Sequence, residues 1–231
     1  MSDTEEGVDA NIDHGAALSY WSSIDPDVNG MLGGYPQISR VDLQGSANFL
    51  AKLRRLSPAS QPPRRAVDCG AGIGRITKGC LSKSFEVVDI VEPVAKFTEQ
   101  IRSDEILMKE GKVGEVYTEG LETWSPKNGL YDVMWNQWCL GQLTDEQLVA
   151  YLRKSVKALK RGGWIIVKEN NCTGESDIFD GVDNSVTRTD DKFRELFQNA
   201  GLTLVRTELQ TGFAKRLGLF PVRFYALQPG S

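Results

Sequence analysis

Three alternating glycines behind an acidic residue form the stretch of this sequence whose chemistry is easiest to interpret. The segment AVDCGAGIGR (66–75) places Gly70, Gly72 and Gly74 at every second position, close behind Asp68. Glycine has no Cβ, so a backbone of this composition can turn tightly and approach a ligand closely. A helix that begins directly after such a loop offers free N–H groups and the positive end of its dipole to an anion. The pattern indicates a site for a small ligand that carries negative charge.

The spacing of these glycines differs from the dinucleotide fingerprint, whose glycines follow G-x-G-x-x-G. A fingerprint that opened at Gly70 and Gly72 would need glycine or alanine at position 75, where this chain has Arg75. An acid followed by G-x-G-x-G instead resembles the first motif of class I methyltransferases, which use S-adenosylmethionine. The glycines alone do not distinguish this interpretation from an ordinary glycine-rich turn of an α/β fold.

Two further positions favour a ligand site beside the glycine loop. Glu92 ends the apolar run 85–91, and a carboxylate about 20 residues beyond such a loop can accept hydrogen bonds from both hydroxyls of a ribose. Gly120-Leu121-Glu122 follows the third predicted strand, at 112–117, where class I methyltransferases usually hold the adenine. The passage LKRGGWIIVKEN (159–170) resembles the helix, glycine pair and fifth strand of that fold. Together these features favour a methyltransferase.

A second group of residues suits the acceptor of a methyl group. Methyl transfer from a sulfonium needs no protonation of the leaving group, so the protein must align the nucleophile and accept its proton. Trp138 follows an apolar run and can stack on a flat or cationic group, and Asn170 ends the next run. Asp180 and Asp183 share the loop DGVDNS. The alternative interpretations are a tryptophan of the core and an exposed turn.

The rest of the chain predicts a scaffold in which these strand ends meet. Strands are predicted at 64–69, 85–91, 112–117, 130–135, 164–170, 202–210 and 220–227, and helices at 16–24, 41–56, 74–81, 94–107, 145–159 and 190–199. This alternation favours a mostly parallel sheet covered on both faces, with one of the last two strands antiparallel. Ligands in such sheets bind outside the carboxyl ends of the strands. Residues 31–39 are expected to form an apolar loop that packs over something, and 171–189 a polar loop.

Composition argues against several other functions. The single histidine, His14, argues against a Ser-His-Asp triad and a multi-histidine zinc site. Four widely spaced cysteines argue against structural zinc and a disulfide framework. The net charge of −4 lacks the basic excess of a nucleic-acid binder. The acidic start has no secretory apolar run, and no stretch approaches the ~20 apolar residues of a membrane span. We therefore expect a soluble intracellular protein.

Several segments together resemble one family, the α-N-terminal protein methyltransferases. They are MLGGYPQIS (31–39), DCGAGIGRITK (68–78), WNQWCLGQLTD (135–145), KEN (168–170) and VDNSV (182–186). The similarity extends from about Tyr20 over nearly the whole chain. Members methylate the free α-amine of proteins that begin X-Pro-Lys or X-Pro-Arg, once the initiator methionine is gone.

The resemblance implies a Rossmann-like fold, with a mostly parallel seven-stranded sheet, helices on both faces and an N-terminal helical extension. Residues 61–231 would form the methyltransferase domain, and residues 15–60 would join it as an extension that contributes to the substrate channel. The acidic residues 1–14 are expected to be a disordered tail.

The resemblance also implies a role for individual residues. S-adenosyl-L-methionine would be bound by Gly70, Gly72, Arg75, Glu92, Leu121, Glu122 and Gln137, with Arg75 facing its carboxylate. The peptide substrate would be bound by Trp21, Leu32, Gly33, Trp138, Asp180 and Ser185. Among these, Trp138 would stack on the second-position proline, and Asp180 and Ser185 would contact the third residue and nearby backbone. Asn170 and Asp183 would hold the α-amine, with Asp183 as the candidate base. No metal is implied.

Two positions depart from the family pattern. Animal members typically have histidine where this chain has Gln142, so deprotonation must rest on Asp183 or solvent. They typically have aspartate where this chain has Glu92, and either carboxylate can bind a ribose. An α-amine has a pKa of ~7.7–8.0, against ~10.4 for lysine, so it is partly neutral at cellular pH and a carboxylate suffices as proton acceptor.

Two other functions stay open at this point. A small-molecule amine N-methyltransferase would share the cofactor half, and residues 1–30 would then form a closing lid. A catalytically silent interaction module would keep the fold alone, but the intact glycine loop, Glu92 and the pair Asn170 and Asp183 argue against it. The acidic charge disfavours nucleic-acid partners, and no membrane partner is expected. The expected substrates include ribosomal proteins, and the expected location is the cytoplasm and also the nucleus.

Overall fold

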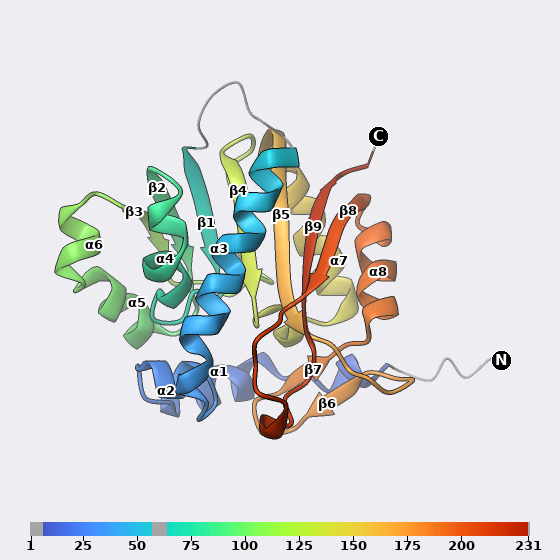
Figure 1. Ribbon diagram of the computed structural model, residues 1–231. Helices are drawn as coiled ribbons and strands as arrows, with labels where there is room; N and C mark the ends of the chain where they lie inside the picture. Colours follow the sequence, from blue (N-terminus) through green and yellow to red (C-terminus); the bar gives the residue numbers. More distant parts are fainter. Residues whose placement is uncertain (1–6, 57–63, 231) are drawn as a thin grey trace.

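A sheet of seven strands, in the order β3-β2-β1-β4-β5-β9-β8, forms the centre of the computed structural model (Figure 1), which describes residues 7–56 and 64–230. The strands are β1 (Arg65–Cys69), β2 (Val87–Val91), β3 (Val113–Tyr117), β4 (Tyr131–Gln137), β5 (Leu159–Asn170), β8 (Leu202–Leu209) and β9 (Val222–Pro229). The first five are parallel, and β9 is antiparallel to both of its neighbours. The predicted sheet and its one antiparallel strand are therefore confirmed.

Alternate residues of the central strands enter two separate cores. Val67, Met134 and Ile165 lie in one cluster, and their neighbours Ala66 and Val133 lie in the other. Successive side chains of a strand point to opposite faces of the sheet. Because both faces are covered, β1, β2 and β4 are each buried at all but one position, as strands of parallel sheets generally are.

Helices cover each face of the sheet, as predicted (Figure 1). On one face lie α3 (Ser39–Leu56), α4 (Arg75–Gly79), η3 (Leu81–Lys83) and α5 (Ala95–Arg102), and on the other lie α7 (Asp145–Ala158) and α8 (Asp190–Asn199). The helix predicted over 74–81 is thus divided between α4 and η3. The single helix predicted over 94–107 is wrong, because α5 ends and α6 (Glu105–Lys109) begins anew. Asp104 causes this break, since its carboxylate caps Ile106 N and Leu107 N.

The N-terminal extension lies at the carboxyl ends of the parallel strands (Figure 1). It consists of η1 (Val8–Asn11), α1 (His14–Ser23), α2 (Val28–Met31) and η2 (Pro36–Ile38). The tail expected to be disordered over 1–14 is therefore wrong for residues 8–14, while residues 1–6 lie outside the described residues. The Asp9 carboxylate accepts a hydrogen bond from Asp145 N and so ties η1 to the start of α7. Leu32 and Ile38 are buried, which confirms that residues 31–39 pack inward.

The polar segment 171–189, predicted to be a loop, contains a small hairpin instead. β6 (Ile178–Asp180) and β7 (Ser185–Thr187) pair antiparallel, with Asp180 opposite Ser185. Each strand has only three residues, too few for alternation to reveal it in the sequence. The hairpin lies against η1 and against η4 (Leu140–Gln142), so its support comes from tertiary contacts.

The other differences are small. β5 begins before the pair Gly162-Gly163 that was expected to open it, and the strand pairing is irregular there. η5 (Lys215–Leu217) lies between β8 and β9. The chain break predicted at 57–63 lies outside the described residues. Within residues 7–56 and 64–230, no helix combines the length and apolarity needed to cross a membrane. No group of three potential metal ligands among His, Cys, Asp and Glu occurs in that part of the chain either.

Candidate functional site

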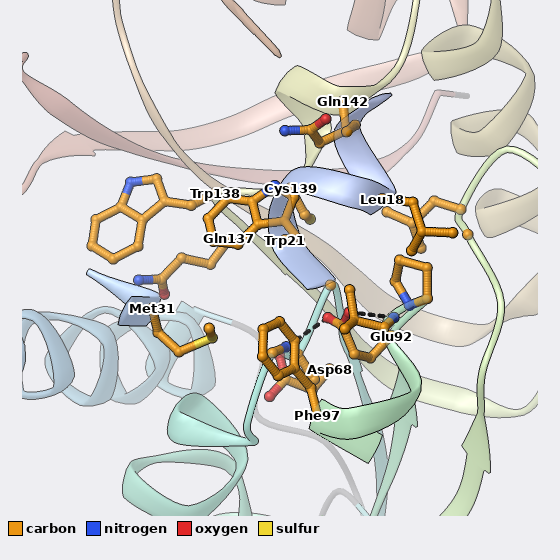
Figure 2. Close-up of a pocket in the computed structure, with 18 of the residues that line it drawn as sticks. Leu18, Trp21, Met31, Asp68, Glu92, Phe97, Gln137, Trp138, Cys139 and Gln142 are labelled. Carbon is orange, nitrogen blue, oxygen red and sulfur yellow. Dashed lines mark hydrogen bonds between the residues drawn. The ribbon is translucent and has the colours of Figure 1, made fainter. Parts of the chain in front are cut away.

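A cavity of about 340 Å³ lies at the carboxyl ends of β1, β2 and β4 (Figure 2). This is where the strand order reverses on either side of β1, the place at which open α/β sheets bind ligands. Its volume is that of a small-molecule site. Helix α1 supplies another wall through His14, Leu18 and Trp21.

The structure brings the predicted cofactor residues together in this cavity. Its lining includes all seven of them, namely Gly70, Gly72, Arg75, Glu92, Leu121, Glu122 and Gln137. Apolar residues from other elements complete it, among them Met31, Val94 and Phe97. The sequence analysis missed these three because an apolar residue that lines a ligand site cannot be told from a core residue by type alone.

The glycine loop needs glycine for two separate reasons. Gly70 and Gly72 have φ of +64° and +55°, a left-handed conformation that residues with a Cβ rarely adopt. A Cβ at Gly70 would also lie 2.3 Å from Cys139 Cβ, and one at Gly72 would lie 2.6 Å from Met31 Sδ. The loop therefore brings bare backbone to the cavity, as the spacing predicted.

Glu92 is held rigidly at the edge of this loop. One carboxylate oxygen accepts a hydrogen bond from Gly72 N at 2.8 Å and the other accepts one from Val94 N at 2.9 Å, drawn as dashed lines in Figure 2. Burial raises the pKa of Glu92 to about 7, although both hydrogen bonds oppose the rise. Each oxygen keeps a further lone pair, so the carboxylate can accept two more hydrogen bonds from a ligand.

Asp68 is also part of the cavity lining, and it anchors the loop to α4. Its carboxylate accepts hydrogen bonds from Thr77 N at 3.0 Å and Thr77 Oγ1 at 2.7 Å. Burial raises the pKa of Asp68 to about 6, against the effect of the Thr77 hydrogen bonds and of the Arg75 charge. The acid that opens the motif thus fixes the shape of the loop.

Arg75 is already paired with a carboxylate that the sequence analysis did not identify. Its Nη1 lies 2.6 Å from Asp42 Oδ2, and Gln137 Nε2 donates to both oxygens of the same carboxylate. Asp42 is completely buried. A signal was present in the sequence, because Asp42 and Ser46 continue the buried stripe of Phe49 and Leu53 along α3.

The acceptor side of the cavity is formed by two of the predicted tryptophans. Trp21 and Trp138 both line it, so Trp138 is not a core tryptophan remote from the site. Trp138 has φ of +54°, which costs a residue with a side chain about 1–3 kcal/mol. Glu169 stabilises this turn by accepting hydrogen bonds from Cys139 N and Leu140 N. The Trp138 ring has the Arg75 guanidinium 5.6 Å from its centroid.

The remaining predicted residues lie outside the cavity lining. They are Asn170, Asp180, Asp183, Ser185, Leu32 and Gly33. Asp180 and Asp183 come from the β6–β7 hairpin and both raise the pKa of Tyr20, although burial of the Tyr20 hydroxyl contributes more. The two carboxylates therefore lie close to Tyr20 of α1, the residue that precedes Trp21. The structure places the hairpin beside the cavity rather than in it.

Asp183 has the environment of a partly desolvated carboxylate. Its Oδ1 accepts hydrogen bonds from Ser185 Oγ at 2.6 Å and from Ser185 N at 3.1 Å. Burial raises the pKa of Asp183, the Ser185 hydroxyl opposes the rise and the charge of Asp180 adds to it. A raised pKa makes a carboxylate a better proton acceptor than one in water.

Two cavity residues carry polar groups that the sequence analysis did not place there. His14 lines the cavity and its Nε2 lies 3.0 Å from Gln147 Oε1, so the single histidine belongs to an ordered helix. Gln142 also lines the cavity, and its Oε1 is buried with no hydrogen-bond partner among the described residues. Gln142 can therefore orient a donor, but an amide accepts no proton at neutral pH.

Comparison with known proteins gives consistent matches over most of the chain. Residues 9–228 match the family described as AdoMet dependent proline di-methyltransferase. The chain is 42% identical over 218 residues to alpha N-terminal protein methyltransferase 1 of Schizosaccharomyces pombe, covering 93% of this chain and 95% of the relative. It is 43% identical over 202 residues to N-terminal Xaa-Pro-Lys N-methyltransferase 1-A of Xenopus laevis, covering 87% and 89%.

Solved structures agree with this result. A SAM-dependent methyltransferase from Leishmania major is 34% identical and superimposes with a TM-score of 0.82. The match covers 93% of this chain and 82% of that one. Phosphoethanolamine N-methyltransferase 1 from Haemonchus contortus, solved with S-adenosylhomocysteine, has a TM-score of 0.73 at 16% identity. That match covers 94% of this chain and 49% of the other. The second likeness concerns the fold alone.

Proposed function

This chain belongs to the AdoMet dependent proline di-methyltransferase family, and we propose that it methylates proteins whose free N-terminus reads Xaa-Pro-Lys or Xaa-Pro-Arg after removal of the initiator methionine. It is an S-adenosylmethionine-dependent protein N-terminal methyltransferase. The observation that carries the substrate proposal is the indole of Trp138, which lines the same cavity as the predicted cofactor residues. An aromatic ring offers a flat apolar surface to a prolyl ring at the second position of a peptide.

The residues around the glycine loop fit the cofactor. The loop leaves room that a Cβ would fill, and Glu92 keeps lone pairs for the two ribose hydroxyls. Leu121 and Glu122 would hold the adenine, and Arg75 would face the carboxylate of the amino-acid end. When bound, S-adenosylmethionine supplies a methyl group on a positively charged sulfur, which an amine attacks in line.

Asp183 is the proposed proton acceptor for the substrate amine. An α-amine has an ordinary pKa of ~7.7–8.0, and burial brings the pKa of Asp183 closer to that range. A smaller pKa difference favours proton transfer from the ammonium to the carboxylate. The amide oxygen of Asn170, at the end of β5, would accept a second N–H and so orient the lone pair of the amine. Gln142 would take no proton, so the family histidine has no replacement as a base.

The hairpin would also recognise the third residue of the substrate. Asp180 carries a negative charge at the exposed turn of the hairpin, which complements a lysine or arginine. Ser185 would bind nearby backbone. Trp21, Leu32 and Gly33 would line the channel through which the peptide enters.

The family resemblance alone is the basis for two further parts of the proposal. The substrates include ribosomal proteins, and the protein is located in the cytoplasm and the nucleus. Charge argues against nucleic-acid partners, because the chain carries 31 acidic residues against 27 basic ones.

The test is a methylation assay read by mass spectrometry. One peptide would begin Ser-Pro-Lys with a free α-amine, and the control would be the same peptide with its α-amine acetylated. We expect methyl gain on the free peptide only. A third peptide that begins Ser-Gly-Lys tests the stacking of proline on Trp138 and should react much more slowly. If neither proline peptide reacts although the cofactor binds, the acceptor is a small molecule or the chain is a silent module.

A further inference from the structure

A buried polar cluster lies directly behind the wall of the cavity that carries Arg75 and Gln137. Its centre is the carboxylate of Asp42 on α3, which has no exposed side-chain surface. It accepts hydrogen bonds from Arg75 Nη1, from Gln137 Nε2 and from Lys168 Nζ. Lys168 is equally buried and also donates to Ser46 Oγ at 3.0 Å and to Asp42 O at 3.1 Å.

At neutral pH the hydrogen-bonded cluster contains one more positive charge than negative, because Lys168 stays mostly protonated although burial lowers its pKa to about 8. The Arg75 guanidinium and the Lys168 ammonium share the single carboxylate of Asp42. The carboxylate of Asp68 does not belong to the cluster, because it accepts its hydrogen bonds from Thr77. Buried charges are costly unless they are paired, so a cluster with a positive excess favours an anion in the adjoining cavity. Arg75 and Gln137 are the two members that reach it.

Asp42 controls the position of both of these residues. It offers the carboxylate that orients the Arg75 guanidinium, and it is the acceptor for the Gln137 amide. Without it, the cations of Arg75 and Lys168 would face each other in a buried space and repel. The Trp138 ring has both cations near its face, at 5.6 and 5.9 Å, so such a movement would reach the acceptor side as well.

We propose that Asp42 and Lys168 are positioning residues for the cofactor, acting through Arg75. Asp42 orients the guanidinium, and Lys168 supplies the second positive charge that leaves Arg75 incompletely neutralised and able to bind the carboxylate of the amino-acid end. This inference rests on the proposed contact between Arg75 and that carboxylate. It makes α3, which precedes the glycine loop, part of the cofactor site.

The test compares two ligands that differ at the amino-acid end. S-adenosylhomocysteine carries the carboxylate, whereas 5′-methylthioadenosine keeps the adenine, ribose and sulfur but lacks it. Dissociation constants would be measured by calorimetry on the full chain with no peptide present. Asp42→Asn increases the positive charge of the cluster but removes the group that orients Arg75, and we expect the lost orientation to prevail. The variant should therefore bind S-adenosylhomocysteine at least tenfold more weakly and change the affinity for methylthioadenosine less than twofold.

A matched control is Asp89→Asn. Asp89 is as deeply buried as Asp42 and binds Arg65 and the Tyr131 hydroxyl, yet it does not line the cavity. This variant should leave the ratio of the two dissociation constants unchanged even if it lowers stability. A second variant, Lys168→Met, keeps the pair of Asp42 and Arg75 and removes the extra charge. It should weaken the binding of S-adenosylhomocysteine at least threefold without changing the affinity for methylthioadenosine. This variant tests the inference even if Asp42→Asn does not fold.

Three results would overturn the inference. They are an equal loss of affinity for both ligands in the variants, no loss of affinity for either ligand, and equal affinity of the wild-type protein for the two ligands. The first would mean that Asp42 only supports the fold, and the last that no carboxylate contact exists. Failure of the peptide assay alone would instead contradict the proposed substrate, because no peptide enters these binding measurements.

Discussion

The cofactor side and the acceptor side of the cavity are built in different ways. On the cofactor side, the glycine loop and Glu92 come from one short stretch of chain and are joined directly, Gly72 N to the Glu92 carboxylate. The acceptor side brings together α1 and the turn at Trp138 from distant parts of the chain, and the β6–β7 hairpin lies beside it. The glycine loop and Glu92 therefore depend on local backbone geometry, whereas the acceptor side depends on tertiary contacts.

The two sides also differ in burial. Asp68 and Glu92 are 2% and 5% exposed, whereas Val182 at the hairpin turn is 68% exposed and Asp183 is half-buried. Substitutions on the cofactor side should therefore affect both stability and cofactor binding. Substitutions on the hairpin should affect turnover with little cost in stability, because surface changes are usually worth less than about 0.5 kcal/mol.

The largest effect is expected at Asp183. The change Asp183→Asn removes the proposed base and should lower turnover about 100-fold or more, since a positioned proton acceptor typically contributes that much. The affinity for S-adenosylhomocysteine and the melting temperature should stay near those of the wild type. Steady-state kinetics on the Ser-Pro-Lys peptide provides the measurement, with Glu175→Gln on the same segment as control. Unchanged turnover would remove Asp183 from the mechanism.

The change Gly70→Ala tests the cofactor side. The added Cβ would meet Cys139 Cβ at 2.3 Å in a left-handed conformation, so stability should fall by about 1–3 kcal/mol and cofactor affinity should fall strongly. Gly201→Ala is the matched control, because Gly201 has φ of +77° but open space around it. Denaturant unfolding and calorimetry would separate the two variants. Equal effects on cofactor affinity would show that the close approach at Gly70 is unimportant.

The change Trp138→Ala tests whether the acceptor side binds the peptide. Loss of the ring should raise the KM for a proline-containing peptide about tenfold, equivalent to about 1.4 kcal/mol of contact. Affinity for S-adenosylhomocysteine should change much less. Kinetics with peptides that carry proline or glycine at the second position would check this, since the glycine peptide has no ring to lose. Equal losses for both peptides together with lost cofactor affinity would instead indicate a packing role.

The smallest effect is a pH dependence set by Glu92. Burial raises the pKa of Glu92 to about 7 in the folded protein, against ~4.3 in an unfolded chain. Its contribution to stability therefore increases as the pH falls, and is lost as the pH rises through about 7. Cofactor affinity should run the opposite way, because a protonated carboxyl loses an acceptor for a ribose hydroxyl.

Calorimetry with S-adenosylhomocysteine at pH 6 and pH 8 measures this dependence. We expect the wild type to bind a few-fold more weakly at pH 6. The variant Glu92→Gln should lose most of the difference, since its amide does not titrate, while other titrating groups such as Asp68 remain unchanged. An equal pH dependence in both proteins would mean that another group is responsible.

The sequence analysis was most accurate where local chemistry and burial agree. The strand before Gly70 and the strand before Glu92 are each buried at four of their five positions and are rich in β-branched or apolar residues, so both their existence and the position of the loop between them were predictable. The seven residues that the family resemblance assigned to the cofactor all line one cavity. Asp104 shows the limit, because its capping of α6 outweighed the apolar periodicity that predicted one continuous helix.

The errors concern segments whose order depends on distant partners. His14 was expected in a disordered tail, yet it lies in α1 and its ring is hydrogen-bonded to the Gln147 side chain at the start of α7. The hairpin that carries Asp183 was expected to be a loop, since three-residue strands leave no clear pattern. Arg188 supports this region by donating to Leu140 O and Leu143 O, a contact that no local pattern reveals.

Apolar periodicity and glycine spacing act over a few neighbouring residues, so the sheet, the glycine loop and the family could be predicted from the sequence. Three features became visible only in the folded chain: α1 forms a wall of the cavity, the hairpin carboxylates lie beside it, and Asp42 pairs with Arg75. Such contacts join residues far apart in the chain. Their energies depend on burial and on the position of each charge, and neither is defined until the chain has folded.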